Sequence, residues 1–312
     1  MKTLDETYYV QTLEAFIERC DQEQVTLAWI RAKMPSLLKA VRWPVSTAEV
    51  VRVIGVGSGK GIMDVDVLKL VQRECPENPI HCIGIEPNPD ELARFKKRAA
   101  EEKSFSLGRT TFEWHEKISE DFESLLPSRP DNRYHVIHMF QMLYHVRDME
   151  ETIQNYYNNL TEGGLMVITI ASKDGNDLLK AFEDYEATIP NLHDLPAQNM
   201  KRYSDDVLPI LRRHAVPYRL ETVAYRVDVS ECFVQGSLAG KMLLDFICLT
   251  NATCVYQSLA ESDRSALLNS LSNYCKLEGD GRRMLTLTFD CITCYKGSQP
   301  WMCNGVVEQD GV

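Results

Sequence analysis

Residues 53–64 read VIGVGSGKGIMD, an apolar run that breaks into alternating glycines and then continues with helical spacing. Every second position across the break is glycine: Gly55, Gly57, Gly59 and Gly61. Glycine at this density lets the backbone turn sharply and approach a ligand closely, because no Cβ stands in the way. The stretch therefore predicts a strand that ends in a ligand-binding turn. Three ligand classes suit such a turn: a nucleotide phosphate, a dinucleotide, or an adenosine-bearing molecule without phosphates.

Strand and helix patterns alternate around this turn. The expected strands are apolar runs at 50–56, 81–87, 110–115, 134–140 and 164–172. Segments with helical spacing lie between them, at 62–73, 90–100, 120–126 and 148–160. Such alternation is typical of an α/β fold with a doubly wound, Rossmann-like parallel sheet. A helical pattern at 5–40 precedes the sheet. A looser pattern follows it, with strands near 218–226 and 284–295 and a helix at 263–275.

The composition is that of an ordinary globular protein and excludes several function classes. The chain has 312 residues, of which 44% are hydrophobic and 25% charged, and its formal net charge is −11. This excess of acidic residues gives no sign of the basic surface with which proteins bind nucleic acid. No apolar stretch reaches the roughly 18 residues of a membrane helix, and MKTLDETYYV lacks the apolar core of a signal peptide. The ten scattered cysteines favour reduced thiols, so a cytoplasmic location is expected.

The residues around the glycines exclude a phosphate ligand. A P-loop requires Ser or Thr after its lysine, whereas Lys60 is followed by Gly61. A dinucleotide motif counted from Gly55 requires glycine at the position of Lys60. Both phosphate-binding interpretations therefore fail.

The end of the next expected strand points to adenosine. This strand ends in Ile85-Glu86-Pro87. A carboxylate at that place can accept hydrogen bonds from both ribose hydroxyls of an adenosine moiety. It also suits S-adenosyl-L-methionine, which has no phosphates to repel. The alternative interpretation is a solvated glutamate at the end of a strand.

The glycine turn and Glu86-Pro87 together resemble the class I S-adenosylmethionine-dependent methyltransferases. More specific stretches resemble the histamine N-methyltransferase family: FEWHEKIS, VIHMFQMLYHVRDMEETI, and DVSECFVQG followed by LLDF. The similarity extends from about Tyr9 to Tyr295. It implies a monomeric enzyme that transfers a methyl group from S-adenosyl-L-methionine to a ring nitrogen of a small imidazole substrate.

The resemblance also implies a set of cofactor-binding residues. Gly57 would begin the cofactor cradle, Glu86 would accept the ribose hydroxyls, and Ser119, in the loop after 110–115, would lie near the adenine amine. Glu91 stands where the family has glutamine, and Phe140 stands where isoleucine is more usual. The expected set lies at or just past strand ends, where open α/β sheets bind ligands: Gly55, Gly57, Gly59, Glu86, Glu91, Ser119 and Phe140.

Aromatic residues match the substrate pocket of the family. They are Tyr9, Tyr144, Phe182 and Phe246. An aromatic box suits a flat imidazole ring and a cationic tail through stacking and cation–π contact. For each ring taken alone, packing in the core is the alternative.

Three substrate-pocket positions depart from the family pattern. Gln22 stands where the family has an acidic residue, Leu287 where it has an amide, and His145 where it has a second aromatic hydroxyl. An alignment slip of one residue would instead place Glu23 at the acidic position. Losing a desolvated contact to a charged group costs about 1.5–3 kcal/mol of binding free energy. The absence of an acid at this position also removes repulsion against a carboxylate on the substrate. Carnosine or a similar imidazole dipeptide is therefore the expected substrate, with histamine as the alternative.

Methylation of imidazole requires little catalytic machinery, because the neutral ring nitrogen is already nucleophilic near neutral pH. No committed general base is expected, and His145 is a weak candidate only. His115 and His138 lie in strand patterns and are expected to be core histidines with satisfied hydrogen bonds. The pair Cys291 and Cys294 lacks a second cysteine pair, so neither a metal nor a redox site is expected there.

Four parts are expected along the chain. Residues 1–48 form an N-terminal helical segment over the substrate, and 49–172 form the core that binds S-adenosyl-L-methionine. Residues 173–296 form a smaller α/β portion that binds substrate and completes the sheet, and 297–312 form a disordered tail. A hypothesis of another class is a catalytically silent scaffold that binds the adenosyl group but transfers no methyl.

Overall fold

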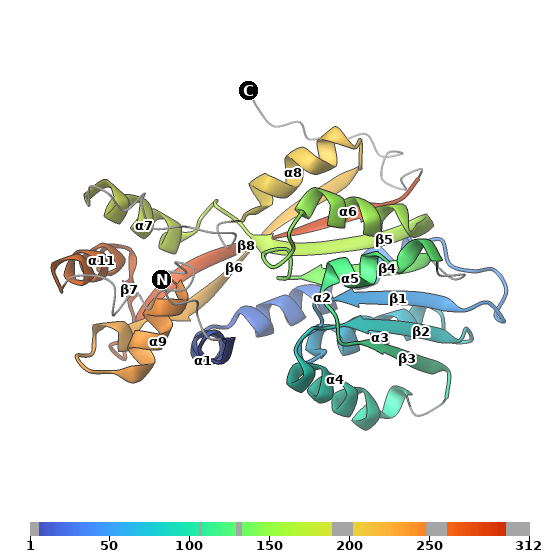
Figure 1. Cartoon of the computed structure of the whole chain (residues 1–312), viewed down its shortest axis with the longest axis horizontal. Helices are drawn as coiled ribbons and strands as arrows, with labels where there is room; N and C mark the ends of the chain where they lie inside the picture. Colours follow the sequence, from blue (N-terminus) through green and yellow to red (C-terminus); the bar gives the residue numbers. More distant parts are fainter. Residues whose placement is uncertain (1–5, 106–107, 129–132, 189–201, 248–260, 298–312) are drawn as a thin grey trace. The chain divides into compact units, whose positions relative to one another are not determined.

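The computed structural model describes the chain except residues 1–5, 106–107, 129–132, 189–201, 248–260 and 298–312 (Figure 1). The chain divides into two compact units. Unit 1 comprises Met1–Val25, Ala171–Asp205 and Thr222–Phe289. Unit 2 comprises Thr26–Ile170, Asp206–Glu221 and Asp290–Val312. The expected tail at 297–312 lies almost entirely outside the described residues.

The sheet has eight strands in the order β3-β2-β1-β4-β5-β8-β6, with β7 paired to β8. The bounds are β1 Val51–Val56, β2 Ile80–Ile85, β3 Thr110–His115, β4 Tyr134–Phe140, β5 Leu160–Ala171, β6 Tyr218–Asp228, β7 Lys276–Leu277 and β8 Arg283–Tyr295. The four neighbouring pairs from β3 to β5 are all parallel. This order, with β1 near the middle and helices between successive strands, confirms the predicted doubly wound α/β fold.

Helices cover both faces of the sheet in unit 2 (Figure 1). The helices are α3 Ile62–Glu74, α4 Pro89–Glu101, α5 Ser119–Glu123, α6 Met149–Asn158 and α8 Ser204–Arg213. Buried side chains of α5, α6 and α8 form one apolar cluster with β1, β2, β4 and β5. On the opposite face, Phe95 of α4 packs against Gly84 of β2 and contacts the Trp114 ring edge-on at 4.7 Å. The apolar runs seen in the sequence are therefore the two buried faces of a central sheet.

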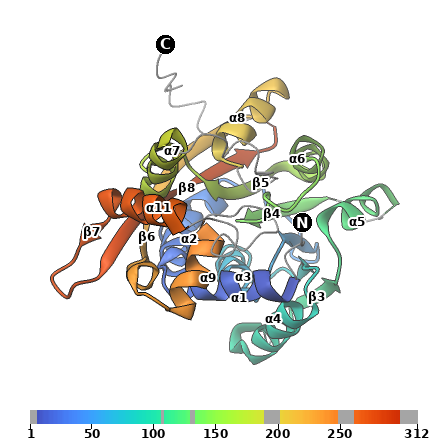
Figure 2. The same cartoon turned by 60° about the vertical axis from the view of Figure 1, so that its left-hand side comes forward.

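Unit 1 contains pairs of packed helices (Figure 2). Its helices are α1 Glu6–Ile17, α7 Asp177–Thr188, α9 Leu238–Ile247 and α11 Glu261–Tyr274. The Tyr8 hydroxyl donates to Asp245 at 2.5 Å, which joins α1 to α9. The Ser270 hydroxyl donates to the Ala181 carbonyl at 2.6 Å, which joins α11 to α7.

The helical pattern at 5–40 contains two helices rather than one continuous helix. α1 ends at Ile17, and α2 spans Gln22–Lys39. Between them Cys20 forms an antiparallel bridge with Val227 of β6. The backbone N–H of Asp21 donates to the Arg226 carbonyl at 3.1 Å. These backbone bonds require extended geometry, which interrupts the helix although the apolar spacing continues through it.

The glycine turn rests on buried polar groups. Asp64 of α3 is 1% exposed and accepts a hydrogen bond from the Ser58 hydroxyl at 2.8 Å. The Nε2 atom of His138 lies 3.5 Å from the same carboxylate oxygen. A Cβ on Gly55 would lie 1.9 Å from Asp64 and 2.7 Å from His138, so only glycine allows this packing. Burial raises the pKa of Asp64 from 3.8 to about 7, with a further contribution from the negative charge of Glu86.

Replacing Asp64 should change how stability depends on pH. The raised pKa means that the folded chain keeps a proton that the unfolded chain releases between about pH 4 and pH 7. Asp64 therefore lowers the free energy of unfolding by up to about 4 kcal/mol as the pH rises through this range. We expect Asp64→Asn to gain stability relative to the wild type as the pH increases from 5 to 8. Chemical denaturation at several pH values measures this difference.

The matched control is Asp66→Asn on the same helix, because the Asp66 carboxylate pairs with the half-exposed Arg31 at 2.5 Å. This control should keep the pH dependence of the wild type. If the stability of Asp64→Asn depended on pH as the wild type does, the raised pKa of Asp64 would be contradicted.

Candidate active site

The glycine turn leaves open space beside one of its residues. Gly57 and Gly59 have φ angles of +65° and +51°, in the left-handed region that favours glycine. A Cβ on Gly59 would meet nothing closer than the Glu91 carboxylate at 4.0 Å, whereas a Cβ on Gly57 would lie 2.6 Å from Met142. The backbone at Gly59 can therefore be approached by a ligand, while the space beside Gly55 is filled by side chains.

Glu86 links the glycine turn to the end of β2. Its carboxylate is 8% exposed and accepts hydrogen bonds from the backbone N–H groups of Gly59, at 2.8 Å, and Asn88, at 2.9 Å. Burial is the largest influence on the pKa of Glu86 and raises it, and the negative charge of Glu91 acts in the same direction. The two hydrogen bonds lower this pKa. A carboxylate has about four acceptor positions, so two bonds leave room for two further donors.

Backbone hydrogen bonds connect three neighbouring strand ends. The N–H of Ser58 donates to the Ile85 carbonyl, and the N–H of Glu86 donates to the His115 carbonyl, each at 3.0 Å. The turns after β1, β2 and β3 therefore lie side by side at the carboxyl edge of the sheet. This is the edge at which open α/β sheets bind ligands.

The other residues of the predicted cofactor set also belong to unit 2. Glu91 lies in the first turn of α4 and pairs with Arg94 at 2.9 Å. Ser119 is the first residue of α5 rather than a loop residue, and it is 7% exposed. Phe140 ends β4, and its ring stacks on His138 with centroids 5.0 Å apart. The structure thus places all seven predicted residues in β1, β4 and the segments that follow β1, β2 and β3.

Sequence reasoning missed Gln141, the residue after β4. Its φ angle is +53°, which is unusual for a residue other than glycine. Its Oε1 atom accepts a hydrogen bond from the Tyr144 hydroxyl at 2.7 Å, and its backbone N–H donates to the Thr169 carbonyl at 3.0 Å. Its buried Nε2 atom has no hydrogen-bond partner among the described residues. Strain and an unpartnered amide at a strand end indicate a ligand-facing residue, and no local sequence signal reveals either.

The predicted substrate residues are divided between the two units. Tyr144 and His145 belong to unit 2, where Tyr144 is half-buried and His145 is exposed. Unit 1 contains the other members of the set: Tyr9, Gln22, Phe182, Phe246 and Leu287. The structure brings Tyr144 together with Gln141 of the same unit.

Within unit 1 the structure places these residues on separate elements. Tyr9 lies in α1, with its side chain outside the described part, and Phe246 lies on α9 with its ring 4.6 Å from Phe16. Phe182 lies on α7 and Gln22 at the start of α2, and both are half-buried. Leu287 lies in β8 and is buried. Glu23 is half-buried like Gln22, so exposure does not distinguish between them.

One expectation about the core histidines is wrong. His138 is buried in β4, but its Nε2 atom has no hydrogen-bond partner among the described residues, because the nearest carboxylate oxygen lies at 3.5 Å. Burial lowers its pKa to about 3, so the ring is neutral at physiological pH. His115 in β3 does have a partner, Glu113, at 2.6 Å from its Nε2 atom.

Cys291 and Cys294 are buried free thiols in β8. Among the described residues, no three His, Cys, Asp or Glu side chains are grouped so as to hold a metal ion. In the same part of the chain, no helix combines the length and apolar character needed to cross a membrane.

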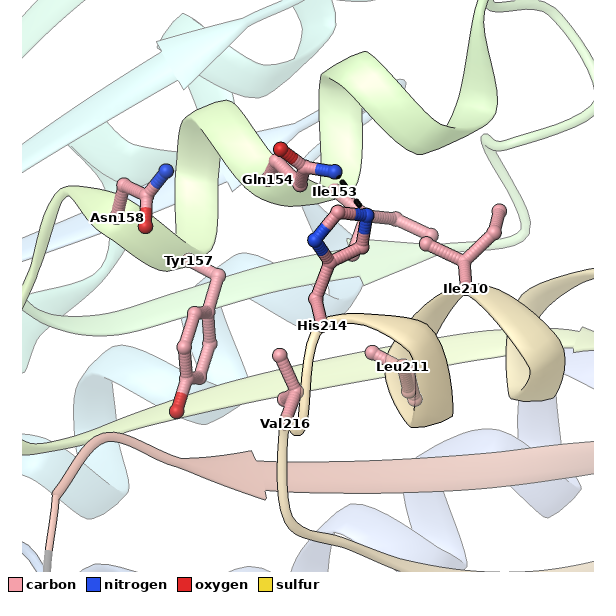
Figure 3. A pocket seen from close by; sticks show the side chains of 8 residues that line it. All are labelled: Ile153, Gln154, Tyr157, Asn158, Ile210, Leu211, His214 and Val216. Carbon is pink, nitrogen blue, oxygen red and sulfur yellow. Dashed lines mark hydrogen bonds between the residues drawn. The ribbon is translucent and has the colours of Figure 1, made fainter.

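A separate cleft lies between α6 and α8 (Figure 3). Its lining includes Tyr157, Ile210 and His214, and the His214 ring contacts Gln154 across it. His214 also lies 2.6 Å from the Glu150 carboxylate. None of the predicted site residues lines this cleft, so we do not assign it to the active site.

Comparisons with known proteins identify the family of the chain. The family model described as a methyltransferase domain matches residues 14–214. Histamine N-methyltransferase A of Xenopus laevis is 28% identical over 89% of this chain and 92% of its own length. Carnosine N-methyltransferase 2 of Gallus gallus is 28% identical over 90% of this chain and 84% of its own.

A further relative and a solved structure extend the comparison. Histamine N-methyltransferase of Danio rerio is 29% identical over 90% of this chain and 94% of its own. The solved structure of loganic acid methyltransferase with SAH shares the fold, with a TM-score of 0.52 and 10% identity over 88% of this chain and 94% of that one. The chain therefore belongs to the methyltransferase-domain family, uses S-adenosyl-L-methionine as its cofactor and is related to the histamine and carnosine N-methyltransferases.

Proposed function

We propose that this protein transfers the methyl group of S-adenosyl-L-methionine to a ring nitrogen of a small imidazole substrate, with carnosine or a similar imidazole dipeptide preferred over histamine. The observation that carries this proposal is Gln141, a strained residue with an unpartnered amide beside the proposed cofactor residues. A cytoplasmic location and a monomeric state belong to the same proposal.

The cofactor fits the residues at the strand ends. Glu86 keeps acceptor positions for two ribose hydroxyls, and the open face of Gly59 lets a ligand approach the backbone. Ser119 and Phe140 would contact the adenine end of the cofactor. The cofactor supplies an activated methyl group on a sulfonium. The chain's task is then to hold the acceptor nitrogen in line with that methyl group and to exclude water.

The free amide of Gln141 favours carnosine. Its Oε1 atom is occupied by Tyr144, so its Nε2 atom is a donor that needs an acceptor. The only acceptor of histamine is the ring nitrogen that must remain free to attack the methyl group. Carnosine also offers an amide carbonyl and a carboxylate. A site that leaves a buried donor unpaired with one substrate and paired with another discriminates between them.

The departures in unit 1 support the same preference. Gln22 and Leu287 provide no carboxylate for a bare ammonium group, and burying an unpaired ammonium is costly. Their contact with the substrate is a prediction from the resemblance. No general base is needed, since the methylated ring releases its extra proton after transfer, and His145 is exposed in the loop that carries Tyr144.

The cofactor assignment is tested by Glu86→Ala. The ribose hydroxyls lose a charged acceptor, so binding of S-adenosyl-L-methionine should weaken about tenfold to a hundredfold, or about 1.5–3 kcal/mol. Isothermal titration calorimetry measures this. The control is Glu101→Ala at the exposed end of α4, which should bind as the wild type does. Unchanged affinity in Glu86→Ala would remove Glu86 from the site.

The substrate assignment is tested by a ratio. We expect kcat/KM for carnosine to exceed that for histamine on one enzyme preparation, measured by methyl transfer. If histamine is favoured by tenfold or more, which is about 1.4 kcal/mol of transition-state preference, the assignment of carnosine is wrong. Glu23→Gln would then test whether Glu23 provides the missing acid.

The role of Gln141 is tested by Gln141→Asn. Asparagine tolerates a positive φ, so the substitution shortens the amide by one methylene without adding backbone strain. We expect kcat/KM for carnosine to fall about fivefold to a hundredfold, as for the loss of one buried hydrogen bond, with unchanged affinity for S-adenosyl-L-methionine. Gln154→Asn, in the separate cleft, is the control. An equal loss for carnosine and histamine would show that the amide does not select the substrate.

A further inference from the structure

A buried hydrogen-bond network surrounds Ser119. The Ser119 hydroxyl donates to the Glu123 carboxylate at 2.8 Å, one turn later on α5. The same carboxylate accepts from the Thr152 hydroxyl at 2.9 Å and from the Asn155 amide at 2.7 Å, both on α6. Glu123 is 7% exposed and Thr152 is 1% exposed. A buried carboxylate held by three donors is a strong acceptor with a fixed position.

This network determines which way the Ser119 proton points. A carboxylate accepts and does not donate, so the single hydroxyl hydrogen of Ser119 is committed to Glu123. The Tyr156 hydroxyl lies 3.1 Å from the Ser119 oxygen, and burial raises the pKa of Tyr156 well above its ordinary value. Tyr156 therefore keeps its proton and is the donor in this pair. One lone pair remains on the Ser119 oxygen, and the residue can act toward a ligand only as an acceptor.

We propose that Glu123 is a positioning residue that makes Ser119 selective for a ligand base with an amine at the position Ser119 faces. This inference rests on the proposed function, in which Ser119 faces the adenine of the cofactor. Adenine presents a donor amine at its six position, whereas hypoxanthine presents a carbonyl acceptor there. An ordinary serine could rotate its hydroxyl and bind either group. The serine held by Glu123 binds the amine and opposes the carbonyl.

The test compares S-adenosylhomocysteine with S-inosylhomocysteine, which differ at this position of the base. Calorimetry on the full chain gives a dissociation constant for each, and the preference is their ratio. We expect the wild type to prefer the adenosyl compound by at least about tenfold, as for mismatched buried polar groups. In Glu123→Ala the Ser119 hydroxyl is free to rotate, and the preference should fall to within about threefold.

Two controls separate selection from structural support. Thr152→Val removes another donor to Glu123 but leaves the bond between Ser119 and Glu123, so the preference should stay at the wild-type value even if the melting temperature falls. Glu120→Ala lies on the same helix, where its carboxylate accepts from the Arg147 N–H at 2.6 Å, and should also keep the preference. If Glu123→Ala does not fold, Glu123→Leu fills more of the volume and carries the same expectation.

The outcomes distinguish this inference from the function on which it rests. A folded Glu123→Ala that keeps the wild-type preference would overturn it, as would a wild type that binds S-adenosylhomocysteine without preference for it. In both cases the cofactor site itself would stand. A wild type that binds neither compound would instead contradict the cofactor assignment. Loss of the preference in Thr152→Val as well would show general loosening of α5 and would also overturn the proposal.

Discussion

The hydrogen bond from the Gly59 backbone to the Glu86 carboxylate joins the turns after two neighbouring parallel strands. Each turn alone would be a loop with many conformations, and this bond gives the two a common geometry. The bond depends on the backbone of Gly59, whose φ angle of +51° favours glycine, and on a carboxylate at the end of β2. The backbone bonds from Ser58 to Ile85 and from Glu86 to His115 extend the connection to β3. Hydrogen bonds within the chain thereby join the turns at the carboxyl edge of the sheet.

This arrangement places acidic groups close together in a buried region. Asp64 lies beneath the glycine turn and Glu86 beside it, and the pKa of each is raised, chiefly by burial. The negative charge of Glu86 contributes to the shift of Asp64. Such a site destabilises the folded chain at neutral pH and disfavours phosphate ligands. It suits a ligand that brings hydroxyl donors and no negative phosphates, and this is the character of the family's cofactor.

The sequence predicts the sheet well because its information is local. Apolar runs between glycine-rich turns identify the parallel strands, and β3 and β4 have the expected bounds. The break at Cys20 could not be predicted, because it depends on pairing with Val227, more than 200 residues away. The strain at Gln141 was missed for a similar reason. Its amide is aligned by Tyr144 and its backbone by Thr169, and these contacts leave no periodic trace in the sequence.

Buried polar groups with and without hydrogen-bond partners lie on different elements around the site. Glu123 is buried with three donors on its two oxygens, so it holds Ser119 and the two helices α5 and α6 in one arrangement. The Nε2 atoms of His138 and Gln141, on β4 and directly after it, are buried and have no hydrogen-bond partner in the described part of the chain. A satisfied network rigidifies its surroundings, whereas an unsatisfied buried polar atom costs free energy until a ligand supplies its partner. The chain thus combines a rigid support under the proposed adenine side with a strained, incompletely bonded strand end at Gln141. Selectivity for substrate is expected at that strand end, because binding there removes a cost that the folded protein already carries.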